Sequence, residues 1–96
     1  MNKDEILRQL HEHKAMLALQ FNVKDLALFG SMARGNANDA SDIDILVTFD
    51  GPATSARYFG LQFYLEDLLG YPVDLVTDKA LRSELRPYIE REALHV

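Results

Sequence analysis

The segment from Asp42 to Phe49 constrains the fold of this chain more than any other, because every second residue along it, from Ile43 to Phe49, is apolar. Such alternation is typical of a strand, in which successive side chains point to opposite faces. One face would carry Ile43, Ile45, Val47 and Phe49, and the other would carry Asp42, Asp44, Leu46 and Thr48. Asp42 and Asp44 would therefore point the same way, about 6–7 Å apart. Two carboxylates so placed can bind divalent metal ions, and magnesium usually combines one or two carboxylates with phosphate oxygens of a substrate.

A glycine and an arginine precede this strand at positions that suit phosphate binding. The apolar run from Leu26 to Phe29 predicts a buried strand that stops at Gly30, and Ser31 begins a short helix. Backbone N–H groups at such a helix start can bind a phosphate, and the guanidinium of Arg34 could hold it. Two plainer interpretations stay open, since a glycine is common wherever a strand turns into a helix and Arg34 could simply be solvated.

The remaining pattern predicts helices between three strands. The expected elements are a helix over residues 2–19 that Asn2 and Glu5 cap, strands at 26–29, 42–49 and 73–77, a polar loop at 36–41, a helix at 55–69, and a last helical segment that Asp78 caps and Pro87 breaks before a second short helix through Ile89. This order predicts an α/β fold, a small sandwich whose sheet is largely covered on one side.

Asp74 lies in the third expected strand, between Val73 and Leu75. Its side chain would reach Asp42 and Asp44 if that strand neighbours the second one. Three carboxylates that converge repel one another unless cations or protons balance them, and aspartate is depleted in strands. A metal site would explain the arrangement. No Walker-type loop and no GxGxxG motif occurs, so a nucleotide would be held in another way.

Composition narrows the classes of function. The chain has 96 residues, no cysteine and a formal net charge of −5, from 15 acidic and 10 basic residues. We expect one domain over residues 1–96. The acidic balance disfavours nucleic acid as a direct substrate, because phosphate backbones are bound by Lys and Arg. Near the C-terminal end arginines alternate with glutamates, which indicates a solvated helix face; these are Arg82, Arg86 and Arg91 with Glu84, Glu90 and Glu92.

Three absences bear on location. No apolar run approaches the roughly 20 residues that a membrane-spanning helix needs, and the charged first residues do not form a secretory signal. Without cysteines, disulfides and thiolate zinc sites are excluded. We therefore expect a cytoplasmic protein that does not enter the membrane.

The histidines and the aromatic residues are less informative. The histidines lack a zinc-ligand spacing and are predicted to lie on the surface; they are His11, His13 and His95. A dense aromatic group in the helix at 55–69 is predicted to belong to the core or, in part, to a partner interface; it consists of Tyr58, Phe59, Phe63 and Tyr64.

Three motif blocks in order give the chain a family resemblance. They are Gly30-Ser31 with Ala33-Arg34-Gly35, then Ser41-Asp42-Ile43-Asp44, then Val73-Asp74-Leu75-Val76. The set resembles the nucleotidyltransferase superfamily of DNA polymerase β. Within it the chain is most similar to the minimal nucleotidyltransferases, the MNT antitoxins that are paired with HEPN-domain ribonuclease toxins. The likeness spans essentially the whole chain.

The resemblance implies a small three-stranded mixed sheet flanked by about four helices, with ATP as substrate and two Mg²⁺ ions. Gly30 and Ser31 would contact the β- and γ-phosphates, and Arg34 would lie near them. Ser31 and Arg34 would belong to the catalytic residues. Asp42 and Asp44 would hold both metals, and Asp74 would ligate the one that activates the attacking hydroxyl. That hydroxyl would belong to a tyrosine of a HEPN toxin, with which the chain would form a hetero-oligomer.

Three other functions are compatible with the sequence. An antitoxin could block its toxin by steric binding without catalysis. A related enzyme could modify a small molecule of the aminoglycoside type, although that branch uses a further domain or a dimer partner to form the acceptor pocket. The plainest alternative is a structural α/β domain whose aspartates coincide by chance.

Overall fold

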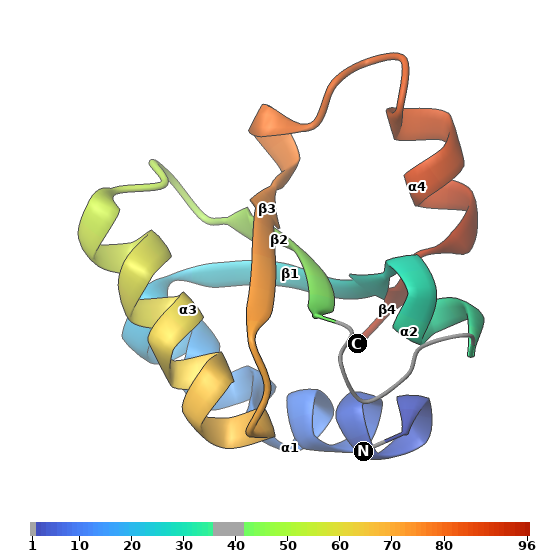
Figure 1. Cartoon of the computed structure of the whole chain (residues 1–96). Helices are drawn as coiled ribbons and strands as arrows, with labels where there is room; N and C mark the ends of the chain where they lie inside the picture. Colours follow the sequence, from blue (N-terminus) through green and yellow to red (C-terminus); the bar gives the residue numbers. More distant parts are fainter. Residues whose placement is uncertain (1, 36–41) are drawn as a thin grey trace.

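A four-stranded mixed sheet with helices packed on both faces forms the framework of the chain (Figure 1). The computed structural model describes residues 2–35 and 42–96, so the loop expected at 36–41 lies outside the described residues. The elements in chain order are α1 (Lys3–Phe21), β1 (Val23–Phe29), α2 (Gly30–Arg34), β2 (Ile43–Phe49), α3 (Ser55–Leu69), β3 (Val73–Thr77), the 3₁₀ helix η1 (Asp78–Ala80), α4 (Arg86–Glu92) and β4 (Leu94–His95).

The strand order is β3-β2-β1-β4. β2 is antiparallel to β1 and parallel to β3, and β4 runs antiparallel to β1. The predicted α/β class, the mixed sheet and the adjacency of the second and third strands are confirmed. β4 was not predicted, because two residues carry no periodicity and this strand exists only through its pairing with β1. None of the helices described here combines the length and the apolar content that crossing a bilayer requires.

The main core fills the space between one face of the sheet and the helices α1 and α3. Ile43, Ile45 and Val47 are fully buried there, as the alternation of β2 predicts. The helices contribute the fully buried residues Ile6, Leu10, Leu17, Leu61 and Leu65.

A second, smaller cluster covers the other face of the sheet. Ala27, Phe29 and Leu46 are buried in it, and Ile89 and Ala93 from α4 and the residue after it pack against them. The sheet is therefore covered on both faces, whereas the sequence predicted that it would be covered largely on one side. This cluster matters for the site, because Leu46 belongs to the same face of β2 as Asp44.

The predicted helix boundaries are largely confirmed, with one correction. Asn2 accepts a hydrogen bond from the Glu5 N–H at the start of α1, and α3 begins and ends where the sequence predicts. Asp78 does not cap the last helical segment. The Thr77 hydroxyl oxygen accepts from Ala80 N–H instead, and a single 3₁₀ turn follows before the chain runs to α4, whose first turn contains Pro87.

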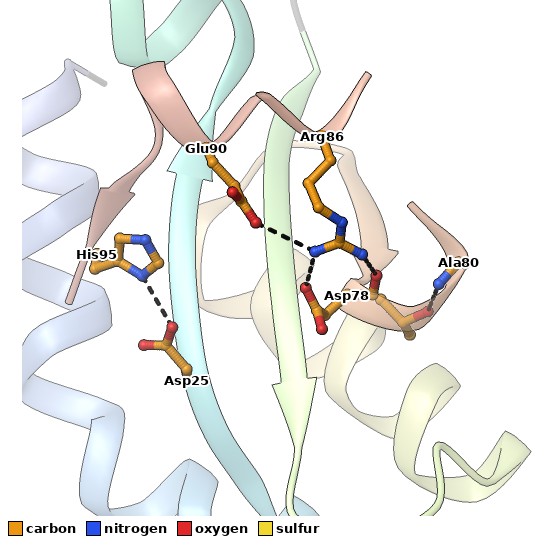
Figure 2. Close-up of polar contacts among 7 residues, drawn as sticks. Asp25, Asp78, Ala80, Arg86, Glu90 and His95 are labelled. Carbon is orange, nitrogen blue, oxygen red and sulfur yellow. Dashed lines mark hydrogen bonds and ion pairs between the residues drawn. The ribbon is translucent and has the colours of Figure 1, made fainter. Parts of the chain in front are cut away.

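Arg86 joins the start of α4 to η1 (Figure 2). Its Nη1 donates to Asp78 Oδ1 at 2.8 Å and to Glu90 Oε1 at 3.2 Å, and its Nη2 donates to the Asp78 carbonyl at 2.9 Å. Arg86 remains partly exposed, as the predicted solvated face implies, but the sequence could not indicate its ion pair with Asp78, because that contact depends on η1 folding back to meet it.

Leu17 and Leu19 on α1 offer a matched test of this architecture. Leu17 is fully buried, whereas Leu19 is 86% exposed. We expect Leu17→Ala to lower the free energy of unfolding by about 2–5 kcal/mol, since it leaves a cavity. Leu19→Ala should change it by less than about 0.5 kcal/mol. Urea titrations followed by circular dichroism measure both, and equal losses would contradict the assigned core.

Candidate active site

Asp44 and Asp74 lie directly opposite each other on the neighbouring parallel strands β2 and β3. Residues at matched positions of adjacent strands place their side chains on the same face, close enough to interact. Asp44 is half-buried and Asp74 is exposed. The pair forms where the sequence predicted that the third strand would bring its aspartate to the second.

Burial is the largest cause that raises the pKa of Asp44, from its ordinary value of 3.8 to about 6. The negative charge of Asp74, a hydrogen bond between the two carboxyl groups and the charge of Asp42 raise it further, while the Arg34 guanidinium lowers it. A hydrogen bond between two carboxyl groups needs one proton, so Asp44 keeps its proton up to about pH 6. A metal cation would serve the same purpose.

Gly30 is the residue on which the close packing of this site depends. Its φ is +73°, and a Cβ added to it would lie 2.1 Å from Asp44 Oδ2. Any other residue would have to adopt a disfavoured backbone conformation and push the carboxylate aside. The glycine therefore does more than turn the chain, because it lets the start of α2 lie against the Asp44 side chain.

The short helix α2 is anchored on one side and open on the other. Met32 is buried in the main core, and Ala33 packs against it from a partly buried position. Arg34 points outward with 49% of its side chain exposed, and its charge acts on Asp44. Ser31 is half-buried near the start of the helix. The roles predicted for Ser31 and Arg34 stay predictions.

Asp42 precedes β2 and is exposed. Its charge acts on Asp44, but among residues 2–35 and 42–96 no three acidic or histidine side chains are gathered so that they could hold one ion. The expected convergence of three carboxylates is thus only partly formed, with Asp44 and Asp74 together and Asp42 nearby. The ligand role of each aspartate stays a prediction.

Side chains of α3 hold the outer edge of β3 and thereby position Asp74. The Tyr58 hydroxyl donates to the Leu75 carbonyl, Gln62 Nε2 donates to the Val73 carbonyl, and Val73 N–H donates to Glu66 Oε2. Tyr58 and Tyr64 are partly buried against the core. The rest of the aromatic group, Phe59 and Phe63, is exposed. Core packing is therefore confirmed for Tyr58 and Tyr64, and a partner interface that includes Phe59 and Phe63 stays a prediction.

Glu92 is a residue of this site that the sequence did not single out. Its Oε1 accepts from Gly30 N–H at 3.2 Å, and Arg34 Nη1 donates to Oε1 at 3.2 Å and to Oε2 at 2.9 Å. Glu92 was interpreted as part of a solvated helix face. Because it is separated from Arg34 by 58 residues, local periodicity contains no sign of this contact.

Of the histidines, His95 has a charged partner. His95 Nδ1 lies 2.9 Å from Asp25 Oδ2 across β4 and β1, and both side chains are exposed (Figure 2). His13 is half-buried and its Nδ1 contacts the carbonyl of Gln9, while His11 is exposed. His11 and His95 lie on the surface as predicted, whereas His13 is only partly exposed.

Comparison with known proteins identifies the family to which the chain belongs. The profile of the nucleotidyltransferase domain family matches residues 5–95, and the chain belongs to that family. Protein adenylyltransferase MntA of Thermococcus cleftensis is 40% identical over 93 residues, which cover 97% of this chain and 94% of the relative. A protein of Methanocaldococcus jannaschii, provisionally named a protein adenylyltransferase, is 44% identical over 87 residues, 91% of this chain and 86% of that protein.

Solved structures agree with this assignment. A structure described as a minimal nucleotidyltransferase superposes with a TM-score of 0.82 at 37% identity, covering 98% of this chain and 95% of that one. A toxin–antitoxin complex with AMP-PNP contains a chain of the same fold, with a TM-score of 0.70 at 23% identity and coverage of 99% and 72%. The resemblance to minimal nucleotidyltransferases is therefore confirmed.

The raised pKa of Asp44 predicts how Asp44→Asn changes stability without metal. The native state holds this proton up to about pH 6 and the unfolded chain only to about pH 4, so wild-type stability falls as the pH rises between these values. The substitution removes that loss. In a chelating buffer we expect the melting temperature of the variant to match wild type near pH 4 and to exceed it by roughly a few degrees above pH 6.

The control for this experiment is Asp67→Asn, which alters an exposed residue of α3. Thermal unfolding followed by circular dichroism across pH 4 to 8 measures all three proteins. An Asp44→Asn variant that is less stable than wild type at pH 7, or whose difference does not depend on pH, would contradict the crowded carboxylate pair.

Proposed function

We propose that this chain is an antitoxin enzyme that transfers AMP from ATP to a tyrosine hydroxyl of a cognate HEPN ribonuclease toxin and thereby inactivates it. The observation that carries the proposal is the Asp44–Asp74 pair beside the backbone of Gly30. Similar proteins support it. The Thermococcus relative is a protein adenylyltransferase. A solved complex that contains a chain of the same fold holds a tri-AMPylated HEPN toxin of Shewanella oneidensis with an MNT antitoxin.

The start of α2 would bind the triphosphate. The Gly30 N–H group and the Arg34 guanidinium lie close enough together to bind the same carboxylate, so they can also bind the same phosphate group. An arginine suits this task because its charge is permanent and its donors match the oxygens of a phosphate. Ser31, the next residue, would complete the contact with the β- and γ-phosphates.

The acidic residues fit magnesium. The donors are all carboxylate oxygens, which magnesium prefers. Burial and then the neighbouring carboxylates raise the pKa of Asp44, so a cation bound there would also stabilise its charged form. Asp44 and Asp74 would hold the ions together with Asp42 and phosphate oxygens, and we propose two ions. When bound, such ions neutralise charge on the entering and leaving oxygens of a displacement at phosphorus.

Asp74 is placed to meet the acceptor. It is exposed on β3, the strand at the edge of the sheet, where the side chain of another protein can approach. The tyrosine oxygen would attack the α-phosphorus of ATP, forming one P–O bond, while the bond to the bridging oxygen breaks and pyrophosphate leaves. The carboxylate of Asp74 would accept the tyrosine proton. A cytoplasmic location and a stable complex with the toxin belong to the same proposal.

Mass spectrometry of the toxin tests this reaction. We expect a HEPN toxin incubated with the chain, ATP and Mg²⁺ to gain the mass of AMP on tyrosine. Asp44→Asn and Asp74→Asn should each slow the gain on the order of a hundredfold or more, because each removes a charge that the reaction needs. Asp50→Asn, an exposed aspartate just beyond the other end of β2, is the matched control and should keep the wild-type rate. A toxin that stays unmodified yet is inhibited would refute the enzymatic proposal.

Neutralisation in cells separates catalysis from steric binding. We expect the double variant Asp42→Ala and Asp44→Ala to lose protection of cells that express the toxin, while it still binds the toxin in a pull-down. The measurement is colony survival at matched expression of the antitoxin. Protection at unchanged potency would mean that binding is sufficient and that AMP transfer is not the mechanism.

A further inference from the structure

The anion-binding donors of the candidate site already bind an anion that belongs to the chain itself. The Glu92 carboxylate accepts from Gly30 N–H with one oxygen and from Arg34 with both, at distances of 2.9 to 3.2 Å. Gly30 has a single N–H hydrogen, so the same group cannot serve a phosphate oxygen at the same time. A phosphate and a carboxylate beside one guanidinium would also repel each other.

The backbone around Glu92 is fixed from both sides. Arg86 binds Asp78 at the start of α4, as described above. Beyond its end, β4 pairs with β1, Val96 N–H donates to the Leu26 carbonyl, and Lys14 Nζ donates to the Val96 carbonyl at 2.7 Å. Ile89 and Ala93 pack on the sheet between these contacts. These contacts hold the backbone at Glu92 in place, so its carboxylate can leave Gly30 and Arg34 only by a rotation of the side chain.

We propose that Glu92 is a built-in competitor of the nucleotide, whose carboxylate occupies part of the triphosphate site until ATP displaces it. The inference rests on the proposed function, since it assumes that ATP binds at Gly30 and Arg34. Because α4 and β4 are held by the contacts described above, ATP would displace the carboxylate through a rotation of the Glu92 side chain while the helix stays in place.

The exposure of the pair indicates that the exchange is easy. The side chains of Arg34 and Glu92 are 49% and 30% exposed. Ion pairs with this much solvent contact contribute little net stability. A triphosphate with several negative charges can therefore replace one carboxylate, whereas an anion of low charge, such as inorganic phosphate, gains less from the same donors. Glu92 thus makes the site selective for highly charged ligands.

Calorimetric titration of the full chain with magnesium and the non-hydrolysable analogue AMP-PNP tests this role. Glu92→Gln keeps the shape but removes the charge, and we expect it to bind the analogue roughly two- to fivefold more tightly than wild type. Glu92→Asp keeps the charge but is one methylene shorter, so it should lose the contacts and also bind more tightly. Glu90→Gln is the matched control, because Glu90 lies on the same helix and binds Arg86; its affinity should equal that of wild type.

Each result decides one of the two proposals. Unchanged or weaker binding by Glu92→Gln would overturn the competitor role, and weaker binding would make Glu92 a support for Arg34 instead. Tighter binding by Glu92→Gln together with wild-type affinity of Glu92→Asp would indicate general charge repulsion and would overturn occupancy of the site. If wild type and all variants fail to bind the analogue, the proposed nucleotide site itself is wrong and the competitor role fails with it.

Discussion

The contact between the backbone of Gly30 and the side chain of Asp44 is the constraint on which the rest of the site depends. Because a Cβ at Gly30 would lie 2.1 Å from the Asp44 carboxylate, glycine alone allows α2 to start beside that carboxylate. The same approach brings the Gly30 N–H and the Arg34 guanidinium near the Asp44–Asp74 pair. The proposed phosphate donors and the proposed metal ligands thus lie together because of one close contact between β2 and the residue that follows β1.

Negative charge is the second organising feature of this region. Burial and the neighbouring carboxylates raise the pKa of Asp44 to about 6, because its negative charge is poorly solvated and lies close to that of Asp74. The positive charge of the nearby Arg34 is paired with the carboxylate of Glu92. Two partners from the solvent and the chain thus offset the charges of this region: a proton on Asp44 below about pH 6, and the Glu92 carboxylate on Arg34. In the proposed function, a metal ion would replace the proton and the nucleotide would replace the Glu92 carboxylate.

Much of this protein could be predicted from local pattern. The alternation of β2 identified both its buried face and the aspartate on the other face, and the capping residues and Gly70 set the bounds of α1 and α3. The short apolar run before Thr77 identified β3. Elements that depend on distant partners were missed or misjudged. β4 has two residues and exists through its pairing with β1, and Arg86 is held by an aspartate in a turn that has no periodic signal.

The sequence by itself determined which residues are candidates for the chemistry: the glycine that begins α2, the arginine that ends it, and the aspartates of the strands, because these depend on residue type and short spacing. Only the tertiary structure decided how they meet. The parallel pairing of β2 with β3 put Asp44 opposite Asp74, and the return of α4 over the sheet put Glu92 on Gly30 and Arg34. Both contacts join residues far apart along the chain, and long-range contacts are fixed by packing and strand order rather than by local pattern.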